Sequence, residues 1–486
     1  MKHFFYKGYN ELLSGKEEFE DKLKIVKKEL SKILETRNLS ILLGSGCSLG
    51  DFGIPTMKQL ADTFFEQKEE NITKLSPTLQ SLLLNASHIA TLEKYKIDFL
   101  KEPFRNNLEI FLGTLYSIRF YLVQVKNGAE VIEIDLVIEQ TKNFILYKCL
   151  NEENKGKDGD IKENYKNFYR KLSLRDSNLP KPNIFTTNYD LYSEKSMDEL
   201  GITYTNGFSG FIERYFNPSI FNYALAEQMD ISSLKWNVID SFIYLFKIHG
   251  SVNWIEVEET NKLFNVQELQ SVDFDFLSKT KNQMIYPSPI KQNASLGSPY
   301  SDLFREFQKR IAQNQSVLIT MGYSFSDEHI NNLIYQALTI PTFRLVVFTD
   351  TKYWTEEGTK SRENIDKLIK LNDPRIWIIG TNDSDIITTP TEVIPTTEDG
   401  KLESLGVIGI ESPIIQEENM VIAKKVIEID GKTEAIVKEP IPKEKKLHFF
   451  NTIINDLLPD WTENKIELQN AEIIKLLHKN SDKSQE

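Results

Sequence analysis

The sequence predicts an α/β protein built on a doubly wound parallel sheet, with a large helical insertion and a C-terminal appendage. Short apolar runs bounded by Gly, Asn, Asp or Pro alternate with stretches of helical period, which is typical of a parallel sheet covered on both faces. A long, mostly helical stretch at about 66–175 interrupts this alternation. Beyond residue 385 the chain contains several prolines and has only weak helical period until about residue 446.

The composition is that of an ordinary globular protein, with 486 residues, 40% of them hydrophobic and 27% charged. It excludes collagen-like, disordered and disulfide-scaffold classes and leaves room for an enzyme-sized core. The net charge of −13 argues against direct nucleic-acid binding by most of the surface and against an anionic membrane. We expect a cytoplasmic protein, since neither a signal peptide nor a run of about 18 apolar residues is found.

The first elements follow from apolar spacing. Apolar residues every three or four positions predict an amphipathic helix over 16–37, so region 1–38 is expected to be a helix packed on the core. The compact run at 39–43 predicts a buried strand that enters a glycine turn. Thr56 with Gln59 forms a capping-box pattern at the start of the next helix.

The remaining elements complete the predicted domain at 39–385. The polar run at 151–164 predicts an exposed loop. Region 386–486 is expected to be irregular and then helical, at about 446–457 and 463–479, and is a candidate for oligomer or partner contacts. Further strands are predicted at 183–186, 244–248, 316–321, 345–348 and 376–379.

Glycine-containing and polar motifs follow four of these strands. Ligands of parallel sheets bind beyond the carboxyl ends of the strands, so these positions suit a binding site. Glycines let a backbone approach a phosphate, and a histidine with a pKa near 6.5 suits general-base catalysis. The motifs are Gly44-Ser45-Gly46-Cys47-Ser48, Thr186-Thr187-Asn188-Tyr189-Asp190, Lys247-Ile248-His249-Gly250-Ser251 and Gly322-Tyr323-Ser324-Phe325-Ser326-Asp327.

Each motif taken singly also has a purely structural interpretation. The glycine turn can be an ordinary strand-to-helix corner. Asn188 or Asp190 can form an Asx turn, and Ser326 can be the N-cap of the following helix. His249 can be a hydrogen-bonded structural histidine.

Taken together, and with Gly53-Ile54-Pro55-Thr56 between the first two, the motifs resemble the sirtuin-like family of NAD-binding proteins over about 39–350. The forms TTNYD, HGS-x-x-W and GYSFSD look more like the bacterial sirtuin-like defence proteins than like protein deacetylases. The resemblance implies a Rossmann-like sheet with NAD across the strand ends and Asn188 and His249 as catalytic residues. It also implies that NAD is contacted by Gly44, Ser45, Gly46, Ser48, Pro55, Thr187, Asp190, Gly322 and Ser324.

The sequence departs from the deacetylase pattern at four places, one of which is the long helical insertion between the Gly-Ile-Pro and Thr-Thr-Asn motifs. Two cysteines, Cys47 and Cys149, cannot supply the two CxxC pairs of a zinc module. Thr56-Met57-Lys58 stands where Asp-Phe-Arg usually follows Gly-Ile-Pro, and Thr187 replaces the glutamine before the catalytic asparagine. These changes weaken the case for acyl-lysine binding more than the case for NAD binding.

The resemblance therefore implies an NAD+ glycohydrolase that needs no metal, releases nicotinamide and ADP-ribose, and depletes NAD in anti-phage defence. Its implied regulators are a homo-oligomer or a partner such as a HerA-type ATPase or a short Argonaute. Two alternatives stay open. One is an NAD-dependent protein deacylase, and the other is a non-catalytic nucleotide-sensing subunit that regulates an ATPase or nuclease.

Overall fold

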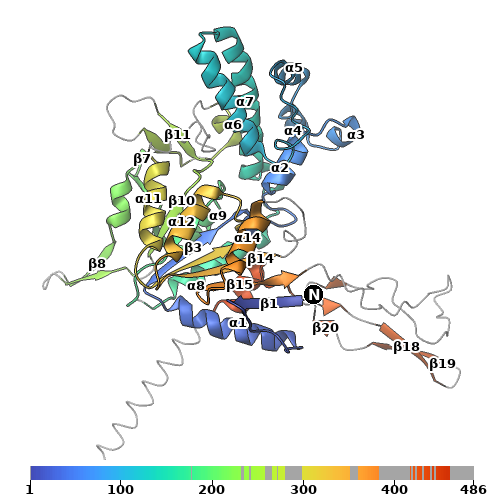
Figure 1. Ribbon diagram of the computed structural model, residues 1–486, viewed down its shortest axis with the longest axis vertical. Helices are drawn as coiled ribbons and strands as arrows, with labels where there is room; N and C mark the ends of the chain where they lie inside the picture. Colours follow the sequence, from blue (N-terminus) through green and yellow to red (C-terminus); the bar gives the residue numbers. More distant parts are fainter. Residues whose placement is uncertain are drawn as a thin grey trace, which may run out of the picture. The chain divides into compact units, whose positions relative to one another are not determined.

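The computed structural model describes residues 2–176, 178–230, 235–239, 242–257, 265–270, 272–279, 298–350, 360–382 and 445–459, and short strands between 416 and 442 (Figure 1). The chain forms two compact units. The larger consists of Lys27–Val347 and Phe449–Glu486, and the smaller of Met1–Val26 and Phe348–His448. All of the motifs described above belong to the larger unit.

The larger unit is built on a parallel sheet in the order β5–β10–β4–β3–β13–β14. The chain runs from β3 outward to β4 and β10 and then returns to β13 on the other side of β3. This reversal defines a doubly wound sheet with its switch point between β3 and β13, which confirms the predicted fold class. The strands are β3 (Asn38–Leu43), β4 (Asn183–Thr186), β5 (Thr203–Thr205), β10 (Phe242–Lys247), β13 (Ser316–Met321) and β14 (Arg344–Asp350, of which 344–347 belong to this unit).

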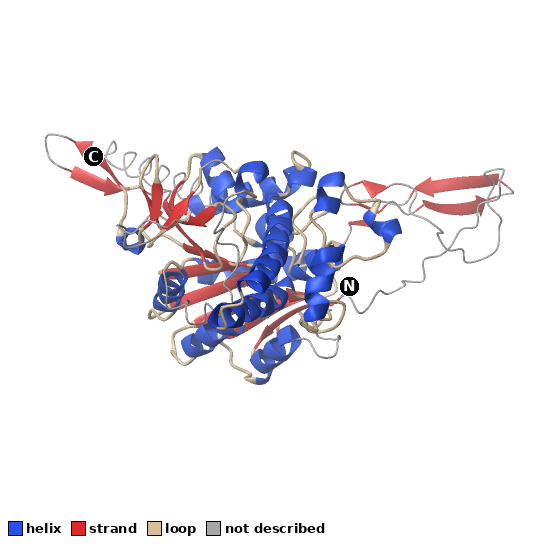
Figure 2. Ribbon diagram, turned by 90° about the horizontal axis from the view of Figure 1, so that it is seen from above, coloured by secondary structure: helices blue, strands red, loops and turns tan. Residues whose placement is uncertain are grey.

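The central strands form where the apolar runs predict them because both of their faces are buried. Every residue of β4 and β13 is buried, so these strands need continuous apolar sequence rather than alternation. Both strands coincide with their predicted ranges. Helices pack on the sheet (Figure 2), and α11 (Tyr300–Ile311) contacts β3, β10 and β13.

The helical insertion lies between β3 and β4. Its two longest helices, α6 (Leu108–Gln124) and α7 (Gly128–Leu150), stand side by side as an antiparallel pair (Figure 1). The predicted capping box is present, since Thr56 accepts from the backbone of Gln59 at the start of α2. The other helices are α2 (Met57–Phe64), α3 (Glu69–Ile72), α4 (Pro77–Ser81), α5 (Ala86–Lys94) and α8 (Gly159–Ser173).

The prediction of an exposed loop over 151–164 is wrong for the second half of this range, because helix α8 begins at Gly159. Asn151 and Asp158, in its first half, are buried. They tolerate burial because both bond the hydroxyl of Tyr192.

Smaller elements complete the larger unit. They include an antiparallel sheet in the order β11–β12–β7–β6 and a β8–β9 hairpin. The bounds are η1 (Ser45–Ser48), η2 (Glu152–Asn154), α9 (Tyr192–Leu200), β6 (Phe208–Ser209), β7 (Arg214–Phe216), η3 (Pro218–Asn222), β8 (Ala226–Asp230), β9 (Lys235–Val238), β11 (Trp254–Glu256), β12 (Val266–Glu268), α10 (Phe274–Leu277), α12 (Glu328–Leu338), α15 (Phe450–Thr452) and the π-helical η5 (Ile453–Leu457).

The smaller unit contains a structure that the N-terminal prediction missed. β1 (Lys2–Lys7) pairs antiparallel with β15 (Ile376–Asn382) and with β2 (Asn10–Glu11), whereas only a helix is expected over 1–38. The predicted helix is α1 (Phe19–Leu34), which begins in this unit. The unit also holds α14 (Lys360–Lys370) and the strands β16 (Gln416–Glu417), β17 (Met420–Val421), β18 (Lys424–Ile429), β19 (Lys432–Val437) and β20 (Ile441–Pro442).

Two further expectations concern the C-terminal region and the membrane. The helix expected at 463–479 lies outside the described residues. Within the described ranges, no helix combines the length and apolar character needed to cross a bilayer.

Candidate functional site

Four strands of the larger unit end on one line across the sheet. Met321 of β13 pairs with Leu43 of β3, Leu43 with Thr186 of β4, and Thr186 with Lys247 of β10. Asn188 and His249 each stand two residues beyond this line. The register therefore brings the glycine loop, the Thr-Thr-Asn motif, the His-Gly-Ser motif and the Gly-Tyr-Ser loop to one edge, where doubly wound sheets bind ligands.

The loops after β3 and β13 meet through their glycines at the switch point. The amides of Gly44 and Gly46 donate to the carbonyls of Met321 and Gly322, both at 2.9 Å. A Cβ on Gly44 would lie 2.4 Å from the Gly322 oxygen, and Gly322 itself has a φ of +61°. These glycines are therefore required for the contact between the loops, and the amides of Gly44 and Gly46 are engaged in that contact.

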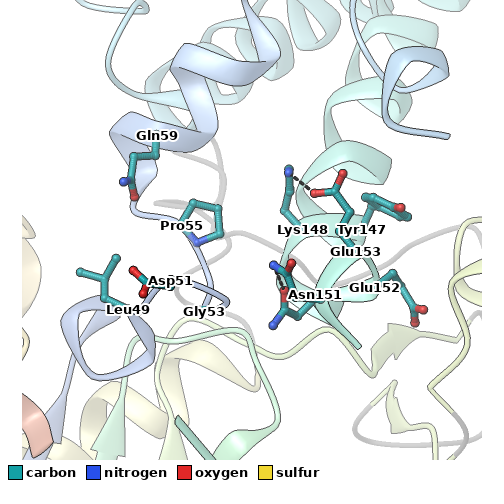
Figure 3. A pocket seen from close by; sticks show the side chains of 12 residues that line it. Leu49, Asp51, Gly53, Pro55, Gln59, Tyr147, Lys148, Asn151, Glu152 and Glu153 are labelled. Carbon is teal, nitrogen blue, oxygen red and sulfur yellow. Dashed lines mark hydrogen bonds and ion pairs between the residues drawn. The ribbon is translucent and has the colours of Figure 1, made fainter. Parts of the chain in front are cut away.

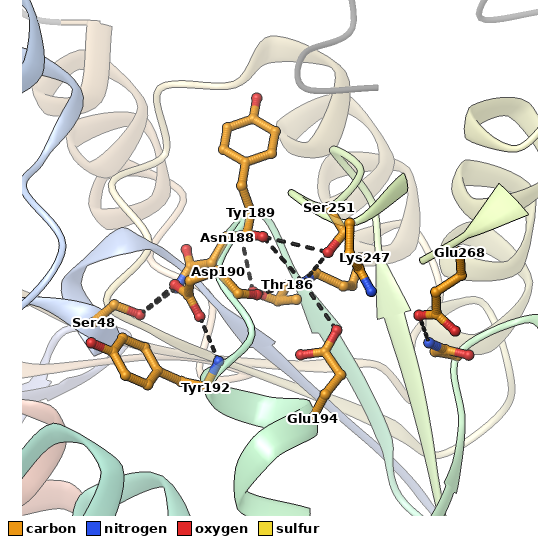
Figure 4. A network of polar contacts seen from close by, with 12 residues as sticks. Ser48, Thr186, Asn188, Tyr189, Asp190, Tyr192, Glu194, Lys247, Ser251 and Glu268 are labelled. Atoms are coloured by element: carbon orange, nitrogen blue, oxygen red, sulfur yellow. Dashed lines mark hydrogen bonds and ion pairs between the residues drawn. The ribbon is translucent and has the colours of Figure 1, made fainter. Parts of the chain in front are cut away.

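Asn188 is the centre of a buried polar network at this edge (Figure 4). Its Nδ2 donates to the Gly44 carbonyl and to Ser48 Oγ, both at 3.1 Å, and more weakly to the Tyr165 hydroxyl at 3.4 Å. The Ser48 hydroxyl in turn donates to Asp190 Oδ2 at 2.8 Å. Because these acceptors fix the amide, Asn188 Oδ1 is turned away from them, and it accepts no hydrogen bond from the described residues.

Ser48 and Asp190, two of the predicted NAD contacts, are part of this network. Their side chains are buried and bond each other. Burial raises the pKa of Asp190, while the charge of Lys247 and the bond from Ser48 act in the opposite direction. Ser48, held by Asp190, thus fixes the orientation of the Asn188 amide.

A buried ion pair supports the same edge. Lys247 Nζ lies 3.0 Å from Glu194 Oε1 and donates to Ser251 Oγ at 2.7 Å and to the Asp190 carbonyl. The side chain of Tyr189 points away from this cluster (Figure 4), while its carbonyl accepts from Lys247. Burial raises the pKa of Glu194, and Lys247 opposes that rise.

His249 forms a pair with Asp327 that the sequence analysis does not identify. Its Nε2 lies 2.8 Å from Asp327 Oδ2, and its side chain is 11% exposed. Burial lowers the pKa of His249, but the hydrogen bond and charge of Asp327, with a contribution from Glu109, outweigh it and raise the pKa overall. Nδ1 has no hydrogen-bond partner among the described residues.

Asp327 is held in place by the helix that follows it. Its Oδ1 accepts from the backbone amides of His329 and Ile330, so Asp327, and not the predicted Ser326, is the N-cap of α12. Burial raises its pKa, but the bond to His249, the charge of His249 and the two amides together lower it to about 2. Asp327 is thus a carboxylate, and because it can only accept, Nε2 of His249 carries the hydrogen.

Other predicted residues are open to solvent at this edge. Ser45 and Ser324 are exposed, while Thr187, Gly46 and Gly322 are half-buried. Ser324 Oγ lies 2.9 Å from the hydroxyl of Ser326, which is also exposed. Hydroxyl groups therefore flank both sides of the switch point, which is a donor set that suits the ribose and phosphate oxygens of a dinucleotide.

Pro55 lies apart from the strand ends. It lines a cavity of about 200 Å³ between the Gly-Ile-Pro loop and the end of α7, with Gly53 and Asn151 among the other lining residues (Figure 3). Small-molecule sites usually measure about 300–1,000 Å³, so this cavity does not enclose a whole dinucleotide. Ser48, Asn188 and His249 do not line it.

Both cysteines are buried and free. Burial raises the pKa of Cys47 well above its usual value and that of Cys149 to about 12. Buried thiols with raised pKa values are poor nucleophiles. Across the described residues, no three His, Cys, Asp or Glu side chains gather as a metal site would require.

Residues 182–364 match the family model described as a SIR2-like domain. This segment of the chain is therefore similar to a SIR2-like domain. The matched segment contains β4, β10 and β13 with Asn188, His249 and Asp327, and a domain of this kind implies binding or use of NAD. Among curated proteins, none matches the chain.

The candidate site also contains residues that the motifs alone do not identify. Asp327 closes the Gly-Tyr-Ser motif but is 78 positions from His249. Tyr165 comes from α8 of the insertion and bonds Ser48 at 2.9 Å. Lys247 begins the motif that contains His249, but its partner Glu194 lies outside every motif. A lysine in an otherwise apolar buried strand is the local signal that predicts a buried anionic partner.

Proposed function

We propose that the protein is an NAD+ glycohydrolase, which cleaves NAD+ to nicotinamide and ADP-ribose. One observation carries the proposal. The His249–Asp327 pair and the fixed amide of Asn188 both follow strands that end at the same edge of the sheet. Bound NAD+ supplies a glycosidic bond whose departing group is neutral nicotinamide. Ser45, Thr187 and Ser324 would hold its ribose and phosphate oxygens at the exposed rim of the switch point.

In this proposal some residues of the site orient other groups, and one residue, His249, accepts a proton. Asp327 keeps the Nε2 hydrogen on His249, so Nδ1 of the neutral ring can accept a proton from a water molecule or a ribose hydroxyl. Asn188 Oδ1 can accept a hydrogen bond from the same water molecule and so orient it. Ser48, Asp190 and Tyr165 keep the amide of Asn188 in that orientation.

Hydrolysis is favoured over deacylation by the state of the two cysteines. A zinc module needs four thiolates, and the chain has two cysteines. Both are buried, in separate elements, with raised pKa values. Water is therefore the acceptor that we propose in place of an acyl-lysine.

We also propose, from the motif resemblance, that the loss of NAD serves anti-phage defence. In this proposal a regulator such as a HerA-type ATPase switches on the enzymatic activity. The proposed activity is tested by incubating the full chain with NAD+, alone and with the product of a neighbouring gene, and measuring nicotinamide. We expect nicotinamide and ADP-ribose, and loss of both in Asn188→Ala and His249→Ala. Formation of O-acyl-ADP-ribose from an acylated peptide, without release from NAD+ alone, would replace hydrolysis by deacylation.

A further inference from the structure

A stretch near the end of the chain packs against α8, the last helix of the insertion. It consists of α15, η5 and the residue after them, and we call 450–458 the C-terminal segment. Lys171 of α8 holds its end, since Nζ donates to the Ile454 carbonyl at 2.8 Å and to the Leu458 carbonyl at 3.1 Å. The buried apolar residues of the segment are Phe450, Ile453, Ile454, Leu457 and Leu458.

Phe450 packs against the ring of Tyr165 on α8. The centroids of the two rings lie 5.1 Å apart, and the Phe168 ring lies 5.6 Å from that of Phe450. The Tyr165 ring also stacks on Tyr192, with centroids 5.6 Å apart and an interplanar angle of 24°. Protein interiors are close-packed, so a buried ring keeps its place through its neighbours. Phe450 and Tyr192 together therefore fix the position of the Tyr165 ring.

The hydroxyl of Tyr165 connects this packing to the amide of Asn188. The single hydrogen of the Ser48 hydroxyl is donated to Asp190, so the Tyr165 hydroxyl, at 2.9 Å, donates to Ser48 Oγ. Burial raises the pKa of Tyr165 well above its usual value, which keeps that hydrogen in place. Asn188 Nδ2 donates to the same Ser48 oxygen and, at 3.4 Å, to the Tyr165 oxygen. A shift of the Tyr165 ring would therefore change two acceptors of the Asn188 amide.

We infer that Phe450 is a positioning residue of the candidate site. Its side chain has no polar atom, so it acts on Asn188 only by fixing the place of Tyr165. The site is then complete only while the C-terminal segment lies on α8. The inference rests on the proposed function, because the catalytic role of Asn188 comes from it. If Phe450 were only a core residue, its loss would lower stability and leave the chemistry of the folded protein unchanged.

The test is a double-mutant cycle on kcat for NAD+ cleavage by the full chain, with Tyr165→Phe, Phe450→Ala and the two combined. Each single variant should lose roughly two- to tenfold in kcat, which is the effect of one hydrogen bond. The double variant should lose no more than the more affected single variant, because both substitutions remove the same hydrogen bond. Independent roles would instead make the two losses multiply.

Two further variants separate positioning from loss of stability. Phe64→Ala is the control, because Phe64 is also a buried aromatic residue but packs on the rings of Phe65, Phe111 and Phe144. It should lower the stability to urea as Phe450→Ala does and leave kcat unchanged. Phe450→Leu leaves a smaller cavity, so it should remain folded and lose less kcat than the alanine variant.

Hydrogen exchange measured by mass spectrometry distinguishes this inference from the proposed function. The amides of Thr187 and Asn188 donate to the Leu43 carbonyl and to Thr186 Oγ1. Their exchange should become faster in Tyr165→Phe and Phe450→Ala but not in Phe64→Ala.

The outcomes are then separable. Faster exchange in these two variants, with no NAD+ cleavage by the wild type, would retain the positioning role of Phe450 and reject the proposed function. Undiminished kcat in Phe450→Ala, losses that multiply in the double variant, or an equal loss in Phe64→Ala would overturn the inference and leave the proposed function standing.

Discussion

Asp327→Asn is the substitution that most sharply tests the proposed base. The carboxylate has two separate roles, because Oδ1 accepts from the amides of His329 and Ile330 while Oδ2 accepts from His249 Nε2. Asparagine is as good an N-cap as aspartate. The amides will retain the asparagine oxygen, so its NH2 group must face His249.

This arrangement reverses the tautomer of His249. An NH2 group donates, so Nε2 must give up its hydrogen and Nδ1 must carry it, which removes the base. General-base catalysis contributes roughly 10²–10⁴-fold, and we expect kcat/KM for NAD+ cleavage to fall by that factor. The substitution also removes the interactions that stabilise the charged carboxylate. A carboxyl pKa lowered from 3.8 to about 2 corresponds to roughly 2.5 kcal/mol of stabilisation, at about 1.36 kcal/mol per pKa unit.

The pH dependence gives a second readout. Asp327 raises the pKa of His249, so the acid limb of the wild-type kcat/KM profile should lie above pH 6.5. Without the carboxylate, burial lowers the pKa of His249, so any residual activity should show that limb at lower pH. The variant should remain folded because the cap remains, and urea unfolding should show a loss of no more than roughly 2.5 kcal/mol. Unchanged kcat/KM together with an unchanged acid limb would refute the role of Asp327.

Two further predictions concern the scaffold of the site. Gly322→Ala places a Cβ 2.5 Å from the Cys47 amide nitrogen, so it should cost roughly 2 kcal/mol or more beyond the strain of positive φ and reduce NAD+ cleavage. Gly201→Ala is the control, because Gly201 has a φ of +65° but no atom lies within 4 Å of the added Cβ. This variant should lose only about 1 kcal/mol of unfolding free energy in urea. Equal losses in the two variants would contradict the contact between the loops. Lys247→Met leaves Glu194 buried without its cation and should cost roughly 3–5 kcal/mol, of which the double variant Lys247→Met with Glu194→Met should recover most. Additive losses in that double variant would argue against the ion pair.

The parts of the fold that depend on local pattern could be predicted from the sequence. β4 and β13 coincide with their apolar runs because strands buried on both faces are continuous in sequence. The capping box at Thr56 is equally local. β1 was missed because its partner β15 lies more than 360 residues away along the chain, and no local signal reports such a pairing.

The candidate site likewise contains residues that the sequence predicts and residues that only the tertiary structure reveals. The positions of Asn188 and His249 follow from strand ends, which the sequence marks. The assignment of Ser326 as the N-cap failed because Ser326 and Asp327 both suit that position, and the choice depends on the distant His249. Tyr165 could not be found either, since it reaches Ser48 only through the packing of α8 from the insertion.

The amount of nicotinamide released from NAD+ in the absence of any peptide tests the central claim most directly. We predict that the full chain, once active, releases one nicotinamide for each ADP-ribose formed. We also predict that His249→Ala and Asp327→Asn both lose this release while remaining folded. Undiminished release by His249→Ala, or release that requires an acylated peptide, would contradict the account.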